Sequence, residues 1–143
     1  MQKFHSRITL MRTISRYFGL TIALEASLFA SDAKALFQQK CAVCHMQTKP
    51  TPKQRSQMVA PPVLGVMFHV KKRYPNRADA VAFIVDYAHN PSKKKALCPS
   101  IKRFGVMPSQ KGAVTKDELK AIASYMFDRF PPADFKPHKG MKH

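Results

Sequence analysis

The residues most able to carry out chemistry lie in one short segment, Cys41-Ala42-Val43-Cys44-His45. Two thiols separated by two residues can add across the two vinyl groups of one haem, and the histidine that follows can then bind the iron as an axial ligand. Thiols are required because they form the thioether bonds, and a neutral imidazole is a good ligand for iron. The spacing therefore predicts that Cys41 and Cys44 attach one haem covalently and that His45 binds its iron.

Three other sites use the same residues and remain open as alternatives. A thioredoxin-like redox pair is expected at the start of a helix that follows a strand, whereas this pair follows a helix-forming stretch. A Cys3His zinc site would join Cys41, Cys44 and Cys98 to a histidine such as His69 or His89, although the spacings match no common zinc module. A structural disulfide would leave the adjacent histidine without a role. If the first two cysteines hold haem, Cys98 is a spare thiol, which we expect to be buried and free.

A second axial ligand has to come from another part of the chain. The sulfur and imidazole candidates are Met58, Met67, Met107, Met126, His69 and His89. We favour Met107, because it stands in a loop between Gly105 and Pro108, where it does not compete for a place in a helix core. Met126 lies on the apolar stripe of the last predicted helix and is expected in the core.

The elements that position these residues are predicted to be helices, and no run of residues has a strand pattern. We predict a helix over residues 33–40 that is capped by Ser31 or Asp32, a helix over 77–89 that is capped by Asn76, and a helix over 116–130 that is capped by Thr115. Residues 46–75 contain several prolines and are predicted to be irregular apart from a short helix near 63–70. Residues 91–114 are predicted to form a long loop. The fold class is therefore all-α.

The chain has 143 residues and a net charge of +17, which suits one basic domain. Residues 1–30 begin with basic side chains and continue with an apolar stretch too short to span a bilayer, so we predict a signal peptide that is cleaved after Ala30. An uncleaved interfacial anchor is the alternative. The prediction places the protein in the periplasm or another exported compartment, with one domain over residues 31–130 and a basic, flexible tail over 131–143.

The charge also predicts the kind of partner. Lys93 to Lys95 and Lys102-Arg103 lie in the loop that contains Met107 and could steer an acidic redox protein toward the site. Anionic lipid is a second partner that so basic a chain can attract. No aromatic-interleaved basic motif is present, so we do not expect nucleic acid as a partner.

The chain resembles class I c-type cytochromes over residues 31–130. The resemblance rests on Phe37 four residues before Cys41, on the Cys41–His45 motif, on Ala60-Pro61-Pro62-Val63-Leu64-Gly65, and on Val106-Met107-Pro108 followed by Thr115, Glu118, Ile122 and Tyr125. It implies a cytochrome c-like fold of three to four helices wrapped around one covalently bound haem c, with the first and last helices crossing so that Phe37 lies near Ile122 and Tyr125. It also implies that the carbonyl of Pro62, or that of Pro61, accepts the Nδ1–H of His45, and that Met107 is the second axial ligand.

These features predict an exported one-electron carrier in a respiratory chain, with histidine and methionine bound to iron. Because both axial positions would be filled by the protein, we do not expect an enzyme. Two alternatives remain at this point. The first is a haem enzyme or gas-binding sensor whose iron site is open because Met107 does not bind it, and the second is a zinc-stabilised Cys3His binding module.

Overall fold

The computed structural model describes residues 32–137. The predicted signal peptide of residues 1–30 and the last part of the predicted tail, residues 138–143, lie outside the described residues. Every regular element within residues 32–137 is a helix, so the prediction of an all-α fold is confirmed. None of the helices in this part of the chain is both long enough and apolar enough to cross a membrane.

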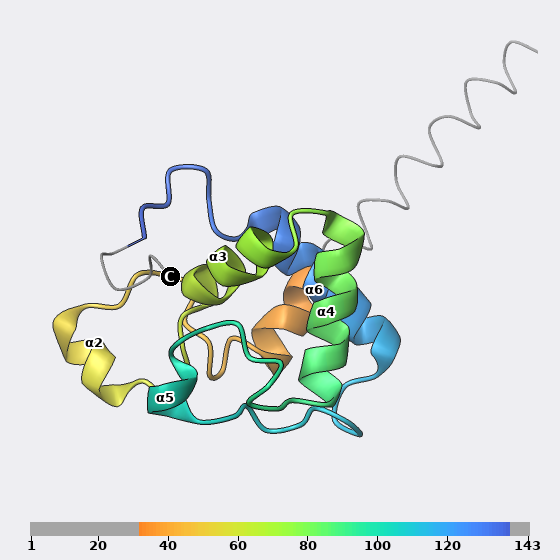
Figure 1. Ribbon diagram of the computed structural model, residues 1–143, viewed down its shortest axis with the longest axis horizontal. Helices are drawn as coiled ribbons and strands as arrows, with labels where there is room; N and C mark the ends of the chain where they lie inside the picture. Colours follow the sequence, from red (N-terminus) through yellow and green to blue (C-terminus); the bar gives the residue numbers. More distant parts are fainter. Residues whose placement is uncertain (1–31, 138–143) are drawn as a thin grey trace, which may run out of the picture. The chain divides into compact units, whose positions relative to one another are not determined.

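The first helix covers residues 32–40 of the described part. The helices that follow are α2 (Pro52–Gln57), α3 (Val63–Arg73), α4 (Arg77–His89), α5 (Ile101–Phe104) and α6 (Lys116–Arg129) (Figure 1). Helix α4 packs along α6, and α3 also contacts α6. Helix α6 is therefore the element against which α3 and α4 pack.

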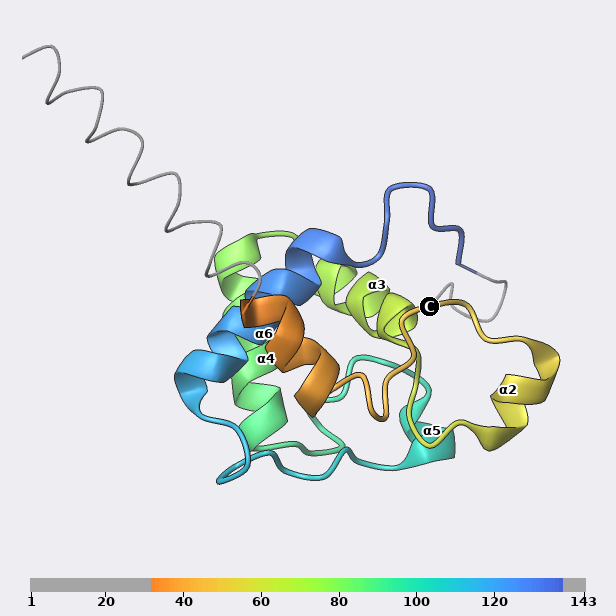
Figure 2. The same ribbon diagram turned by 180° about the vertical axis from the view of Figure 1, so that it is seen from behind.

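The first helix is fixed to α6 by aromatic packing. The Phe37 side chain is fully buried, and its ring centroid lies 5.5 Å from that of Tyr125 and 5.6 Å from that of Phe130. Ile122 belongs to the same buried cluster. The predicted crossing of the first and last helices is confirmed, and the two lie side by side when the molecule is seen from behind (Figure 2).

Two of the predicted helix caps are confirmed. The Asn76 side chain accepts hydrogen bonds from the backbone N–H groups of Ala78 and Asp79 at the start of α4. At the start of α6, Thr115 and Glu118 form both hydrogen bonds of a capping box. These bonds satisfy amides that no helical carbonyl can reach, and so they fix where each helix begins.

The prediction of irregular structure over residues 46–75 is wrong in two places. Helix α3 continues to Arg73, and residues 52–57 form the short helix α2. The start of α2 was predictable from the sequence, because Thr51 and Gln54 form a capping box and Pro52 lies in the first turn, where a backbone N–H would have no helical partner.

Residues 91–114 are a loop, as predicted, except for the single turn of α5. Helix α5 ends at Gly105, whose φ of +75° is a conformation that glycine adopts without strain. Helix α5 lies beside α2, since the Arg103 guanidinium donates a hydrogen bond to the carbonyl of Arg55 (Figures 1 and 2).

The chain beyond residue 130 returns to α3. The ring of Phe135 lies 6.1 Å from that of Phe68. The first part of the predicted tail therefore packs against the helical unit.

Candidate functional site

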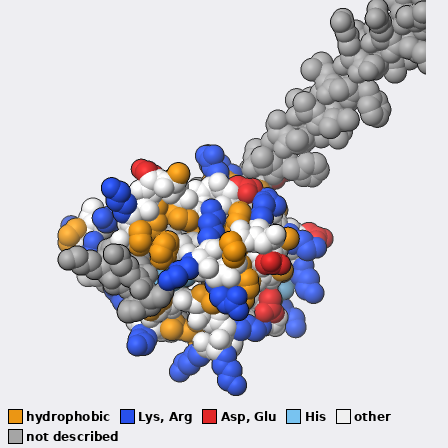
Figure 3. Space-filling view, turned by 45° about the horizontal axis from the view of Figure 1, so that its top comes forward, with side chains coloured by type: hydrophobic (Ala, Val, Ile, Leu, Met, Phe, Trp, Pro, Cys, Tyr) orange, Lys and Arg blue, Asp and Glu red, His pale blue; other side chains and the backbone are white. Residues whose placement is uncertain are grey.

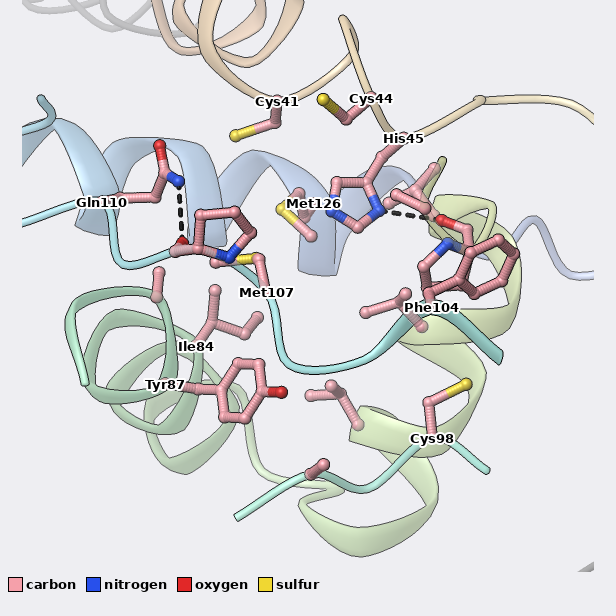
Figure 4. A pocket seen from close by; sticks show the side chains of 18 of the residues that line it. Cys41, Cys44, His45, Ile84, Tyr87, Cys98, Phe104, Met107, Gln110 and Met126 are labelled. Carbon is pink, nitrogen blue, oxygen red and sulfur yellow. Dashed lines mark hydrogen bonds between the residues drawn. The ribbon is translucent and has the colours of Figure 1, made fainter. Parts of the chain in front are cut away.

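A cavity of about 390 Å³ lies among the helices. Its wall comes from the first helix, residues 41–45, residues 59–61, α3, α4, the loop after α4 and α6. Most of the lining side chains are aliphatic, aromatic or sulfur-containing, and Figure 4 shows how some of them point into the space. A cavity of this kind suits a large, mostly apolar ligand held by a few oriented polar groups.

The cysteine segment forms one wall of the cavity. The first helix continues into tight turns in which the amides of Cys41 and Ala42 both donate to the carbonyl of Phe37, at 2.9 Å, and the amide of His45 donates to the carbonyl of Cys41, at 3.0 Å. These turns bring Cys41, Cys44 and His45 to the same side of the cavity (Figure 4).

Both thiols in this wall are free, as is Cys98, so the structural disulfide is not formed. Burial, with a smaller effect from Cys44, raises the pKa of Cys41 to about 11. A thioredoxin-like pair needs a thiol whose pKa is lowered. The environment of Cys41 therefore differs from that of a redox-active cysteine pair.

The ring of His45 is held in one orientation. Its Nδ1 lies 2.8 Å from the carbonyl oxygen of Pro61, and because a carbonyl can only accept, Nδ1 carries the hydrogen. The other ring nitrogen is then free of hydrogen and able to bind a metal. Burial lowers the pKa of His45, although the bond to Pro61 acts in the opposite direction, so the neutral form, which is able to bind a metal, is favoured.

The prediction that Pro62 accepts this hydrogen bond is wrong, and Pro61, the alternative, is the acceptor. The reason is that Pro62 is the N-cap of α3. Its carbonyl accepts from the amides of Gly65, at 3.1 Å, and Val66, at 3.2 Å, as the first carbonyl of a helix does.

Of the candidates for a second axial ligand, Met107 and Met126 line the cavity. Met126 comes from α6 and is 9% exposed in the main buried cluster, whereas Met107 comes from the loop and is half-buried (Figure 4). His89 is used elsewhere, since its Nε2 lies 2.9 Å from the carbonyl oxygen of Val114. The remaining candidates, Met58, Met67 and His69, are not part of the cavity wall.

The loop that contains Met107 is fastened to the end of α4. The amide of Gln110 donates to the carbonyl of Ala88 at 2.8 Å, and the Ser109 hydroxyl donates to the carbonyl of His89 at 2.6 Å. The side-chain amide of Gln110 donates in turn to the carbonyl of Pro108 at 2.9 Å (Figure 4). The last carbonyls of α4, which have no helical partner, thus hold the loop against the cavity.

The third thiol also lies in the cavity wall. Cys98 is half-buried, and its sulfur accepts a hydrogen bond of 2.8 Å from the hydroxyl of Ser100. In residues 32–137 no group of three or more His, Cys, Asp or Glu side chains is close enough to hold a metal ion. The Cys3His zinc arrangement is therefore not formed.

Four lining residues from α4, Phe83, Ile84, Tyr87 and Ala88, were not predicted as part of the site. The apolar spacing along this helix showed that it has a buried face but not what that face contacts. Burial raises the pKa of Tyr87, so its phenol stays protonated beside the cavity.

A family model described as cytochrome c oxidase, cbb3-type, subunit III matches residues 29–126, which contain all of the cavity-lining cysteines, His45 and Met107. The chain belongs to this family of class I c-type cytochromes. An uncharacterized protein of Aquifex aeolicus (strain VF5) is 30% identical over 131 residues, which cover 78% of this cytochrome and 86% of that protein. No solved structure matches.

As a c-type cytochrome, the protein carries covalently bound haem c. The chemistry of the residues in the cavity wall suits haem c. Two free thiols that are separated by two residues, and a neutral imidazole with one free nitrogen, line the same apolar space.

Proposed function

We propose that this cytochrome is a one-electron carrier of an exported respiratory chain, with its haem bonded to Cys41 and Cys44 and its iron bound by His45 and Met107. The observation that carries the proposal is that His45, oriented by Pro61, and Met107, on its fastened loop, line one apolar cavity together with both thiols. Haem c, when bound, supplies the one-electron chemistry.

The two proposed ligands have different tasks. The hydrogen bond from His45 to the Pro61 carbonyl fixes the tautomer of the imidazole and makes its free nitrogen more basic. The thioether of Met107 is a softer and weaker donor, which favours ferrous iron and raises the reduction potential relative to two histidines. The apolar wall, with residues such as Ile84, keeps water away from the site, which also raises the reduction potential.

This ligand set favours a carrier over an enzyme. If His45 and Met107 both hold the iron, the protein itself would supply both axial ligands, and no position on the metal would be left for a substrate. Members of this class are usually exported or associated with membranes. The basic and then apolar residues 1–30 support export to the periplasm.

The test compares Met107→Leu with Met126→Leu, which removes the other sulfur of the cavity wall. Both proteins are produced with a c-type maturation system, and free haem is removed with acid and organic solvent. We expect haem to stay with both proteins. Only Met107→Leu should lose the weak red-edge band of methionine-bound ferric iron, and its reduction potential should fall.

Loss of that band in Met126→Leu alone would assign the ligand to α6 instead. A wild-type protein with a high-spin spectrum would replace the carrier by a haem enzyme or gas-binding sensor with an open iron site. Haem that leaves the wild-type protein on extraction would contradict attachment at Cys41 and Cys44.

A further inference from the structure

We propose that three stacked aromatic rings, those of Tyr74, Phe83 and Tyr87, carry electrons between the haem cavity and a surface at the turn that joins α3 to α4. We call these three rings the aromatic column. The inference rests on the proposed carrier function and adds to it a defined path and a place on the surface where a redox protein can exchange electrons with the haem.

The column is continuous from ring to ring. The ring centroids of Tyr74 and Phe83 lie 4.9 Å apart, and the two planes are inclined by 29°. The centroids of Phe83 and Tyr87 lie 5.8 Å apart, with the planes inclined by 23°. At such separations aromatic rings attract one another. Each ring of the column is therefore in contact with the next.

The positions of these rings follow from the helices that carry them. Phe83 and Tyr87 are four residues apart on α4, so their side chains lie on the same face of that helix. Tyr74 is the C-cap of α3, and its amide donates to the carbonyl of Val70 at 2.7 Å. The column is therefore built on one helix face and one helix end, which hold the rings in fixed positions.

The two ends of the column open on different spaces. Tyr87 and Phe83 line the haem cavity. Tyr74 and Phe83 line a second pocket, of about 520 Å³, whose other lining residues also come from the α3–α4 turn and from α4. Phe83 thus belongs to the walls of both spaces. The column therefore crosses the protein layer that separates the haem cavity from the second pocket.

The second pocket differs in charge from the loop that carries Met107. Asp79 and Asp86 line the pocket together with Arg73, whereas residues 87–116 contain no acidic side chain. Acidic side chains are few in this chain, and on the face that Figure 3 shows Lys and Arg outnumber them. A surface with charges of both signs suits a different redox protein from the one that a purely basic loop attracts.

Contacts between rings matter for electron transfer because an electron crosses a protein by tunnelling. The rate falls steeply wherever the electron has to cross a gap between atoms that are not in contact. The π orbitals of aromatic rings also lie closer in energy to the tunnelling electron than the σ bonds of aliphatic side chains do. A column of rings in contact is therefore a favoured path from the second pocket to the cavity.

The rings act as a bridge and do not themselves hold the charge. Burial raises the pKa of Tyr87, so its phenol keeps its proton, and a phenol that keeps its proton is hard to oxidise. The guanidinium carbon of Arg73 lies 5.0 Å from the centroid of the Tyr74 ring, and this positive charge opposes the loss of an electron from that ring. One electron leaves the donor and one reduces ferric iron to ferrous iron, while each ring ends as it began.

The test measures electron transfer from a ruthenium polypyridyl label that is attached to one introduced cysteine. Cys98→Ser removes the spare thiol, and haem occupies Cys41 and Cys44. The label is attached through Ala82→Cys, in the wall of the second pocket, or through Thr48→Cys, in the segment after the cysteine turn; both positions are exposed. On a flash of light the Ru(II) complex donates one electron to ferric haem and becomes Ru(III), and absorbance records the reduced haem.

Phe83→Leu removes the middle ring and keeps apolar bulk. It should slow transfer from the label at Ala82 severalfold and leave transfer from the label at Thr48 unchanged. The matched control is Phe127→Leu, the same change at a half-buried ring that lines neither the cavity nor the second pocket, and it should change neither rate. Tyr87→Phe keeps all three rings and should also change neither rate.

A second measurement tests the column without electron transfer. Stacked rings shift one another's proton resonances, so Phe83→Leu should move the ring signals of Tyr74 and Tyr87 in the NMR spectrum of the reduced protein, and Phe127→Leu should not. If Phe83→Leu does not fold, Tyr74→Leu, at the half-buried outer end of the column, takes its place in both measurements.

The proposal is wrong if loss of the middle ring leaves the rate from Ala82 unchanged, or if it slows transfer from both labels equally. It is also wrong if Tyr87→Phe slows transfer as much as Phe83→Leu does, since the phenol and not the ring would then be the active group. Ring signals that Phe83→Leu does not move would show that the rings are not stacked.

The optical spectrum and the reduction potential separate this failure from failure of the carrier function. A Phe83→Leu protein that keeps the wild-type low-spin spectrum, potential and transfer rates would contradict the column alone. A wild-type protein without a low-spin spectrum would contradict the proposed carrier, whatever the labels show.

Discussion

Replacing Phe37 with alanine should remove much of the stability of this cytochrome. The side chain is fully buried and lies against two rings, those of Tyr125 and Phe130, at 5.5 and 5.6 Å. Removing a buried phenylalanine costs about 3–5 kcal/mol because apolar burial is lost and a cavity remains. Each aromatic contact contributes about 0.5–1.5 kcal/mol within that loss. We therefore expect the free energy of unfolding to fall by about 4 kcal/mol.

The measurement is urea denaturation of the haem-loaded protein, followed by circular dichroism. With an m-value of about 2 kcal/mol/M, the midpoint should fall by about 2 M. Gln39→Ala, an exposed change in the same helix, should alter stability by less than about 0.5 kcal/mol. In a cycle with Tyr125→Leu, the coupling energy should be about 1 kcal/mol.

This residue also matters for the site. The carbonyl of Phe37 accepts the amides of Cys41 and Ala42, so the ring that fixes the helix also fixes the cysteine turn. A loss below about 2 kcal/mol, or no coupling to Tyr125, would refute the reasoning that Phe37 joins the first helix to α6.

Three further predictions concern the helix ends and the loop. Thr115→Ala should destabilise the protein by about 1 kcal/mol in thermal unfolding, because both bonds of the capping box with Glu118 depend on it; an unchanged melting temperature would contradict this. Gly105→Ala should cost about 1–3 kcal/mol through backbone strain alone, since no atom lies near the added methyl group, and urea midpoints would show it. Arg77 holds the pKa of Asp128 below its ordinary value of 3.8. The pair should therefore stabilise the fold above about pH 4, and this stabilisation should be lost as the pH falls through the pKa of Asp128 in the folded protein. Because both side chains are 52% exposed, Asp128→Asn should lower the free energy of unfolding by only about 0.5 kcal/mol at neutral pH. An acid limb of the stability profile that is the same in both proteins would argue against this pair.

The parts of the fold that could be predicted from sequence are those set by neighbouring residues. The cap at Asn76 and the capping box at Thr115 involve residues no more than three positions apart, so the starts of α4 and α6 could be predicted from the sequence. The cysteine and histidine spacing is equally local, and it placed three wall residues of the cavity correctly. The box at Thr51 was just as local and was missed because the surrounding prolines suggested irregular structure.

The parts that could not be predicted depend on contacts across the chain. The choice between Pro61 and Pro62 depended on where α3 begins, because the first helical carbonyl is committed to the helix. The presence of Tyr87 in the cavity wall depended on how α4 packs, which its own spacing does not determine. The presence of both Met107 and Met126 in the cavity wall could not be predicted either, because they come from segments nearly twenty residues apart and meet only through the packing of the chain.

The hydrogen bond between the Gln110 amide and the Ala88 carbonyl makes the loop observable without any change to the protein. That amide can exchange its proton with solvent only when the loop leaves α4, and such local openings have their own free energy, below that of global unfolding. The exchange rate of one backbone proton therefore measures how often the segment that carries Met107 comes away. If Met107 binds the iron as proposed, this amide should exchange slowly in the wild-type protein, and it should exchange faster in any variant, or in any complex, in which the loop is released.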